Sequence, residues 1–341
     1  MIALFPTPFE DELAYSLFAR YYERSGYINY RSVAEDLFVN PNVKPNIEFC
    51  NLLTNDIQRW IGSMEEFVDK HTMLPYYLFP LPPERQCKAL KKAYAMNVKE
   101  LVNTLIIPRS RTTKYLRFCP LCVENDRNTI GYTYWRRSHQ MYGINVCHLH
   151  GCRLLDSDVP IVSTSSPSVI TAESSVDRCD STISKALPTE VAIAKYSYEI
   201  MNVKIDSKTS LSKFLNGILL DTRYTSIRGA KRYIKELTAD FKEFYKGVSL
   251  YGFEEDWQVE KVLCGDRMNP YEVCLLGMFL DISPQELVSR HKQAPKKNVQ
   301  KFDDLIIRLK AKGYNYREIS EKLGIAYDYS KVLAKRNMRK L

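Results

Sequence analysis

Residues 118–154 read FCPLCVENDRNTIGYTYWRRSHQMYGINVCHLHGCRL, and the rest of the chain is organised around them. The stretch opens with a Cys-x-x-Cys pair, Cys119 and Cys122, and 24 residues further on comes a Cys-x-x-His pair, Cys147 and His150. Each pair places two metal donors on one tight turn, and two pairs at this separation are typical of tetrahedral zinc sites. Because four ligands close the coordination shell, the spacing predicts one structural zinc ion per chain.

The segment between the two pairs carries aromatic and β-branched residues from Tyr132 to Trp135. Such a run favours a β-hairpin, which would return the second pair to the first. The alternative is that these are reduced cysteines scattered through a core, and the paired spacing disfavours it. We therefore expect a small unit that resembles a zinc ribbon.

The chain has 341 residues, 45% of them hydrophobic, which predicts two or three globular domains. Its net charge of +9 is unevenly distributed. Residues 296–341 contain 13 Lys and Arg and 5 Asp and Glu, or +8, which leaves about +1 for residues 1–295. A basic end on a nearly neutral body indicates a polyanionic partner at that end, and a solvated basic tail is the alternative.

The N-terminus shows no basic leader or apolar signal region, and no apolar run approaches the ~20 residues that span a bilayer. The cysteines outside the two pairs are scattered without a disulfide pattern, which fits a reducing compartment. We therefore expect a cytoplasmic protein.

Apolar periodicity predicts a mainly α fold in five parts. These are a helical N-terminal domain (1–112), the zinc-binding unit (113–158), a Ser/Thr-rich linker (159–188), a second helical domain (189–295) and a basic helix-turn-helix (296–341). The expected helices are 9–25, 30–39, 47–61, 64–70, 85–107, 189–203, 209–220 and 225–246, with further helices in 256–267, 269–281 and 283–291. Core candidates of the second helical domain are Trp257, Val262, Leu275, Leu276 and Phe279.

The basic end reads as three helices, at 302–311, 316–323 and 327–337. Ile319 and Leu323 would face inward and Gly324 would make the turn, as in a helix-turn-helix that reads a major groove. Ser330 departs from this pattern, since an apolar residue usually stands there. A helical protein-docking module is the alternative. The candidate DNA-binding residues here are Arg317, Tyr327, Tyr329, Lys331, Lys335 and Arg336, and those of the second helical domain are Arg228, Lys231 and Arg232, which could equally lie on a solvated helix face.

Two stretches of the first 155 residues carry a family resemblance. FPTPFEDELAYSLFARYYERSG (5–26) is similar to the opening proline-acidic-Leu-Ser-x-x-x-Arg helix of the TniQ/TnsD family of transposon target-selection proteins. FCPLC and YWRRSHQMYGINVCHLHGCRL resemble the CPxC, Trp-Arg-x-x-His and Cys-x-x-His-Gly run of that family. A weaker likeness to the longer, TnsD-type members continues through the second helical domain. The chain is shorter than the attachment-site binders of that type, so it is either a short member or one cut after its helix-turn-helix.

The resemblance places the zinc ligands on Cys119, Cys122, Cys147 and His150. His139 is a second choice, and His148 and Cys152 crowd the site. Because the two pairs already close the shell, we expect these three to pack around it.

The resemblance also implies a bacterial origin and a function. Such proteins bind a target, either attachment-site DNA or a CRISPR RNA-guided complex, and recruit an AAA+ ATPase regulator of the TnsC type that activates the transposase. The N-terminal residues that would contact this regulator are Phe5, Phe9, Leu13 and Arg20, with ordinary core packing as the alternative.

No Gly-rich phosphate-binding loop occurs in the sequence, so we expect no ATP hydrolysis by this chain and no enzymatic activity. A zinc enzyme with a base such as Glu124 would need an open coordination position, which four strong ligands do not leave. A zinc-stabilised helix-turn-helix transcription regulator is compatible with residues 296–341 alone, and the likeness of residues 1–155 argues against it.

Overall fold

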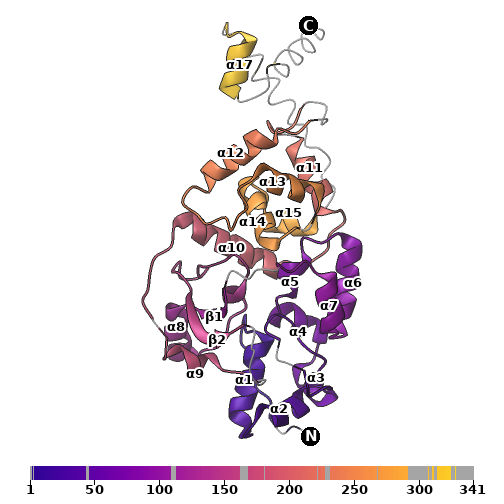
Figure 1. Cartoon of the computed structure of the whole chain (residues 1–341), viewed down its shortest axis with the longest axis vertical. Helices are drawn as coiled ribbons and strands as arrows, with labels where there is room; N and C mark the ends of the chain where they lie inside the picture. The colour runs from indigo at the N-terminus through magenta and orange to yellow at the C-terminus, as the bar shows by residue number, and fades with distance from the viewer. Residues whose placement is uncertain are drawn as a thin grey trace. The chain divides into compact units, whose positions relative to one another are not determined.

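The structure is a computed structural model (Figure 1). It describes residues 2, 4–43, 46–108, 113–161, 168–179, 181–220, 222–226, 231–266, 268–290, 306, 309–310, 313–323 and 327. The fold is mainly helical with a two-stranded sheet, which confirms the predicted fold class. Across the described ranges, no helix combines the length and the apolar composition that crossing a bilayer requires.

Contacts divide the chain into two compact units. Unit 1 comprises Met1–Ser207, Gly247–Tyr251 and Arg267–Ser289, and unit 2 comprises Lys208–Lys246, Gly252–Asp266 and Arg290–Leu341. The N-terminal helices and the cysteine pairs thus share one compact unit. The five-part division expected from the sequence stays a prediction.

In the described residues, unit 1 begins with seven helices, followed by the two strands and six more helical elements. The first group is α1 (Ala14–Ser25), α2 (Tyr30–Leu37), α3 (Asn55–Ile61), α4 (Met64–His71), α5 (Leu74–Leu78), α6 (Pro83–Tyr94) and α7 (Val98–Thr104). The second group is β1 (Tyr115–Phe118), α8 (Pro120–Ile130), the 3-10 helix η1 (Ser138–Gln140), β2 (Leu155–Pro160), α9 (Ala172–Val176), α10 (Pro188–Asn202), α14 (Pro270–Phe279) and α15 (Pro284–Ser289).

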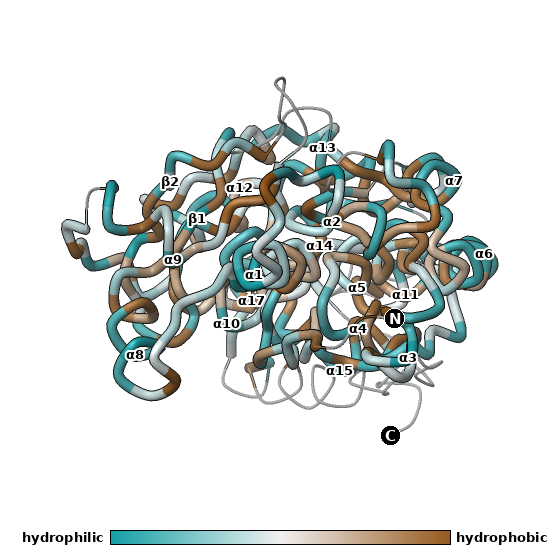
Figure 2. The backbone as a smooth tube through the Cα atoms, turned by 90° about the horizontal axis from the view of Figure 1, so that it is seen from below, coloured by the Kyte–Doolittle hydropathy of each residue, from teal (hydrophilic) through white to brown (hydrophobic). Residues whose placement is uncertain are grey.

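The amphipathic character of these helices sets which side is buried. In α1 the apolar side chains of Leu13 and Leu17 are buried completely or almost so. The surface helix α6 is drawn mostly in teal in Figure 2, and it buries the small or neutral Gln86, Ala89 and Ala93 while its charged residues face solvent.

Several helices are shorter than predicted. Helix α1 starts at Ala14 rather than at residue 9, because Asp11 has a left-handed φ of 56° and the preceding residues form a turn. Residues 47–54 are not helical, and Leu53 pairs with Phe38 in an isolated bridge. The segment 85–107 divides into α6 and α7 at Met96, where φ is +52°.

Unit 2 contains α11 (Leu211–Leu219), α12 (Ile234–Phe244), α13 (Asp256–Cys264) and α17 (Tyr316–Leu323). Ser210 caps α11 by accepting from the amide of Lys213. Helix α12 begins nine residues later than the predicted start at 225, and Thr225 pairs with Arg232 in an isolated bridge instead.

Among the core candidates of the predicted second helical domain, Val262, Leu275 and Leu276 are buried. The prediction for Trp257 was wrong, because 63% of its surface is exposed, and Phe279 is half-buried.

Helix α17 has the predicted bounds, 316–323. The Asn315 side chain accepts from the amides of Arg317 and Glu318, while Glu318 accepts from the amide of Asn315, so the helix starts with a reciprocal cap. Ile319 is buried against Ile306, with Leu323 packed beside them, as expected for the inner side of the helix. The expected turn at Gly324 and most of the expected helix 327–337 lie outside the described residues.

Two mid-helix glycines predict opposite effects of adding a methyl group. At Gly277 in α14 a Cβ would lie 2.6 Å from the Tyr196 hydroxyl and 2.7 Å from a Leu287 methyl, so Gly277→Ala should destabilise the protein by about 1–3 kcal/mol through overpacking. At Gly217 in α11 nothing lies within 4 Å, so Gly217→Ala should be neutral or stabilise by up to about 1 kcal/mol. Urea unfolding of the two variants tests this, and equal effects would contradict it.

Candidate metal centre

The two-stranded sheet brings the two cysteine pairs together. Strands β1 and β2 are antiparallel with Phe118 opposite Leu155, so the chain leaves and re-enters the sheet at the same end. Cys119 directly follows β1, and the turn that carries Cys147 and His150 ends just before β2. The pairs meet because these flanking strands close the intervening loop.

The predicted hairpin between the pairs was wrong. Residues after Cys119 form α8, which Pro120 opens at its first position, and Tyr132 to Trp135 are not in a strand. A Pro at the first helical position is pre-organised for a helix, and the Cys119 sulfur accepts from the Cys122 amide 3.4 Å away like a capping group.

The second pair lies on a tight turn. The amide of Gly151 donates to the carbonyl of Cys147 over 2.9 Å, and the amide of Cys147 donates to the carbonyl of Cys152 over 2.9 Å. Gly151 has a φ of +64°, a conformation that a residue without Cβ adopts at little cost. The turn therefore fixes Cys147 and His150 on one side.

The four predicted ligands converge on one point. The donor atoms of Cys119, Cys122, Cys147 and His150 all lie within 4.8 Å of one another. The Cys122 sulfur lies 3.7 Å from that of Cys147, and His150 Nδ1 lies 3.3, 3.5 and 3.7 Å from the three sulfurs. Zn–S bonds of about 2.3 Å and Zn–N bonds of about 2.0–2.1 Å in a tetrahedron imply separations of roughly 3.8 and 3.6 Å. The group therefore could hold a metal ion of this kind.

The buried thiols of this group influence one another's ionisation. The three cysteines are buried and His150 is exposed, so the cluster meets solvent through the imidazole. The hydrogen bonds of Cys119 and Cys122 lower the pKa of Cys147, whereas hydrogen bonding to Cys122 and Cys147 raises the pKa of Cys119. One thiol can ionise with the help of the others, and a divalent cation is what would hold all three as thiolates.

The additional donors pack around the four. The Cys152 sulfur lies 3.3 Å from that of Cys119, and His139 Nε2 lies 3.8 Å from the Cys122 sulfur. His148 stacks on Tyr198 with ring centroids 3.8 Å apart, and burial lowers its pKa to about 4. None of the three belongs to the four-donor group among the described residues.

The YWRRSHQ stretch connects this centre to the N-terminal helices through buried polar contacts. Arg136 makes an ion pair of 2.5 Å with Asp126 on α8, so it ties the stretch to the helix that carries the first cysteine pair. Trp135 is completely buried, donates its indole N–H to the carbonyl of Ile170 over 2.8 Å, and donates its amide to Ser16 Oγ in α1 over 3.1 Å.

The next residue along, Arg137, forms a second buried ion pair. Its Nε lies 3.2 Å from Asp11 Oδ1, and both side chains are less than 5% exposed. Asp11 also accepts from the amide of Ser138 at 3.1 Å and from its hydroxyl at 2.5 Å. Arg137 reaches further, to the carbonyl of Asp69 and to Asn202 Oδ1 at 2.9 Å. This arginine therefore joins three separate segments of unit 1.

A third buried pair lies within the N-terminal stretch. Arg20 donates to Glu12 Oε2 over 2.6 Å, and Ser16 donates to Glu12 Oε1 over 2.9 Å. Burial raises the pKa of Glu12 to about 7, and the charge of Arg20 opposes that rise. The charged residues of the N-terminal motif and of the YWRRSHQ stretch are therefore buried together with partners of opposite charge.

The predicted regulator-contacting residues belong largely to this core. Leu13 is fully buried and Arg20 is 2% exposed, since it pairs with Glu12. Phe5 is buried against the ring of Tyr21, and Phe9 is half-buried beneath the Arg20 guanidinium at 3.8 Å. In this structure the core-packing alternative describes Leu13, Arg20 and Phe5, because a partner protein could not reach them.

The predicted DNA-binding residues are described in part. Arg317 is exposed on α17 and Tyr327 is 47% exposed. Lys231 is exposed, while Arg232 is half-buried and donates to Asn216 Oδ1 over 3.0 Å. The other five candidates, Arg228, Tyr329, Lys331, Lys335 and Arg336, lie outside the described residues.

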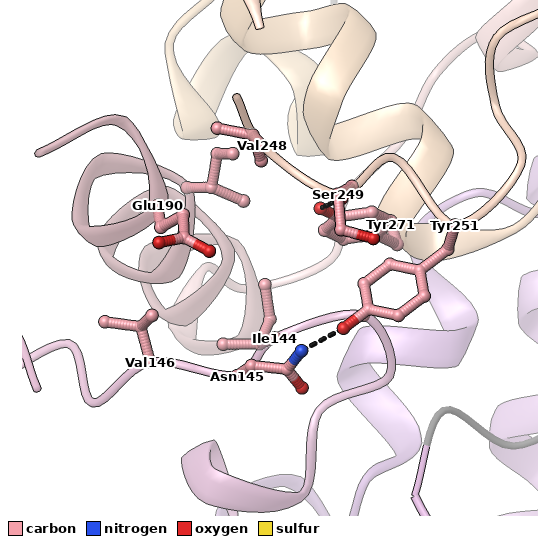
Figure 3. Close-up of a pocket in the computed structure, with 10 residues that line it drawn as sticks. Ile144, Asn145, Val146, Glu190, Val248, Ser249, Tyr251 and Tyr271 are labelled. Atoms are coloured by element: carbon pink, nitrogen blue, oxygen red, sulfur yellow. Dashed lines mark hydrogen bonds between the residues drawn. The ribbon is translucent and has the colours of Figure 1, made fainter. Parts of the chain in front are cut away.

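A small hollow lies beside the second cysteine pair (Figure 3). Asn145 points across it and donates to the Tyr251 hydroxyl, and Arg117 holds the other side of the Asn145 amide at 2.7 Å. The hollow has a volume of about 20 Å³, room for about one water molecule. It is too small for an organic substrate.

Fold and site together define a mainly helical protein built around a closed group of three cysteines and one histidine. Residues 3–154 match the model of the TniQ family, so this part of the chain is a TniQ domain, and the likeness to the TniQ/TnsD family is confirmed. The chain is similar to the transposon Tn7 transposition protein TnsD of Escherichia coli, with 24% identity over 154 residues. The alignment covers 43% of this chain and 30% of TnsD, so the chain spans less than a third of that relative.

Proposed function

We propose that this chain is a non-enzymatic target-selection adaptor of a transposition system. The TniQ match over residues 3–154 is the observation that carries the proposal, and the similarity to a transposition protein supports it. The adaptor would bind attachment-site DNA and recruit an AAA+ regulator of the TnsC type, which activates the transposase. The ATPase and the cutting enzyme would be partners, and the adaptor would work in the cytoplasm.

The metal of this adaptor would be zinc, one ion per chain, held by Cys119, Cys122, Cys147 and His150. Three buried sulfurs and one imidazole at tetrahedral separations favour zinc over harder cations, which prefer oxygen ligands. Its role would be structural, since it fixes β1, α8 and the turn before β2 to one another.

The DNA-binding part would be the basic end of the chain, residues 296–341. It carries +8 of the net charge, and the exposed Arg317 stands one residue after the start of α17, a helix that could approach a phosphate backbone. The residues proposed to contact DNA in this segment are Arg317, Tyr327, Tyr329, Lys331, Lys335 and Arg336. Arg228, Lys231 and Arg232 of the second helical domain would add to them.

The alternative is an adaptor that reaches its target through a CRISPR RNA-guided complex. A footprint over candidate attachment DNA, with and without the AAA+ regulator, separates the two. We expect a sequence-specific footprint from the chain alone. No footprint, together with binding to a CRISPR effector, would favour the alternative. A footprint without binding to the AAA+ regulator would favour a helix-turn-helix transcription regulator.

Salt should weaken DNA binding steeply, because Lys and Arg release counterions when they neutralise phosphates. Removing residues 296–341 should abolish the salt-sensitive binding, and Arg317→Ala should lower the slope of log K against log salt by about 1. The matched control is Lys91→Ala, an exposed lysine on α6, which should leave the slope unchanged. Fluorescence anisotropy between low and moderate salt measures the DNA affinity of each variant and its salt slope. Equal slopes for Arg317→Ala and the wild type would remove Arg317 from the interface.

A further inference from the structure

Several large apolar side chains of unit 1 are exposed on or beside α2 and α3. These two helices lie close to the N-terminus in Figure 1. The exposed side chains are those of Ile28 (97% exposed), Leu4 (72%), Val39 (60%), Trp60 (49%) and Leu52 (43%), and we call them the α2–α3 surface. Soluble proteins rarely leave several such side chains close together unless they mark a site of interaction.

Hydrogen bonds join several parts of this surface. The Trp60 indole donates to the carbonyl of Ile2 over 3.3 Å, which holds Ile2 against α3. The amide of Val39 donates to the carbonyl of Leu52 over 3.0 Å, so these two exposed residues are neighbours. The Thr54 hydroxyl donates to the carbonyl of Asp36 at 2.6 Å and ties the start of α3 to the end of α2.

An acidic hollow of about 260 Å³ lies beside this surface, and its lining includes Ile2 and Thr54, the residues of the two bonds above. Three carboxylates line it, those of Glu35, Asp36 and Asp56, with the rings of Tyr21 and Tyr27 as walls. Its lining contains no lysine or arginine. Arg31 and Arg59 pair with Glu35 and Asp56 at 3.2 Å, but at exposed sites where such pairs exchange readily with other cations.

The third carboxylate, that of Asp36, is fixed in position by a tyrosine. The Tyr21 hydroxyl donates to its Oδ2 over 2.8 Å, and burial together with this bond raises the pKa of Tyr21. The carboxylate is therefore oriented by a neutral donor, and its charge is not cancelled by that contact.

We propose that the α2–α3 surface docks the protein partner of this adaptor through a segment that inserts one Arg or Lys side chain into the acidic hollow. Apolar side chains of the same segment would lie on Ile28, Val39 and Trp60. This inference rests on the proposed function, in which the partner is the AAA+ regulator. An arginine suits the hollow because its planar guanidinium can pair with two carboxylates at once. The same carboxylates would repel the phosphates of a nucleic acid, which makes a protein the occupant.

The test uses the full chain and the purified AAA+ regulator of the same transposition system as the probe. Ile28→Asp removes the most exposed apolar side chain, and Glu35→Lys reverses one charge of the hollow. Ile28 is 97% exposed and Glu35 is exposed at the surface of α2, so both variants should fold like the wild type. Ile183→Asp, at an apolar residue that is 53% exposed elsewhere in unit 1, is the matched control.

We expect each of the two surface variants to bind the regulator at least tenfold more weakly by calorimetry, with Ile183→Asp unchanged and DNA binding intact in all three. If the wild type binds the regulator and both surface variants bind equally well, the docking surface is refuted and the proposed function stands. If the wild type does not bind the regulator at all, both the surface and the recruitment step of the proposed function are overturned.

Discussion

Cys147→Ser is expected to abolish metal binding and to unfold the region around the two cysteine pairs. Binding of a structural zinc contributes about 10–16 kcal/mol to the folding of small zinc domains, whereas a whole protein is stable by about 5–15 kcal/mol. The three sulfurs are buried together, so losing one also leaves two thiols without a cation in the core. Metal analysis should fall from about one zinc per chain to near zero, and thermal unfolding should lose its dependence on added chelator.

Two other cysteines serve as matched controls for this variant. Cys87→Ser alters an exposed thiol on α6 and should leave metal content and stability unchanged. Cys152→Ser alters a buried thiol that touches Cys119 without belonging to the four donors, so it should retain the ion with affinity reduced by about 10–100-fold. A stable Cys147→Ser protein, or zinc lost from Cys152→Ser but kept by Cys147→Ser, would contradict the assigned ligand set.

Asp11→Asn is expected to destabilise unit 1 by about 3–5 kcal/mol, because it leaves Arg137 charged and buried without its carboxylate. Asparagine is a suitable replacement, since it tolerates the left-handed backbone at this position and keeps the size of the side chain. The effect therefore reports on charge and hydrogen bonding rather than on backbone strain. Urea unfolding should show a lower midpoint without a change in slope.

The control for Asp11→Asn is Glu66→Gln on α4. Glu66 also pairs with a cation, Lys70, but both side chains are more than 60% exposed. Exposed pairs of this kind contribute about 0.2–1 kcal/mol. Similar losses for the two variants would mean that the Asp11–Arg137 pair does not hold the N-terminal turn.

The convergence of the four candidate ligands and the mainly helical fold could be predicted because both leave strong local signals. Two residue pairs with metal-ligand spacing identify Cys119, Cys122, Cys147 and His150, and helical periodicity identifies elements such as α10 and α17. The way the pairs meet was not predictable locally, because β1 and β2 are short and separated by 36 residues. The aromatic run between the pairs looked like a strand, but Tyr132 instead lies against Arg20 and Arg24 of α1, and Tyr134 lies against Phe9.

The buried ion pairs were also missed, and here the sequence did contain a signal. Glu12, Ser16 and Arg20 are spaced four residues apart, so they form one polar stripe directly beside the apolar positions Leu13 and Leu17. A charged stripe at the edge of a buried face indicates an internal pair rather than a partner-facing surface. Motif likeness left both partner contact and core packing open for Phe5 and Leu13, because it does not distinguish a residue that contacts another protein from one that holds the core.

The buried bond between Tyr15 and Ile170 has a consequence for how the protein is made. The Tyr15 hydroxyl accepts from the Ile170 amide 155 residues later in the chain, so helix α1 has no complete core until that segment leaves the ribosome. At about 5–20 residues per second this delay is roughly 8–30 s. During that interval the apolar side of α1 is exposed on the nascent chain. We therefore expect a translational pause placed before residue 170 to raise aggregation more than one placed after it.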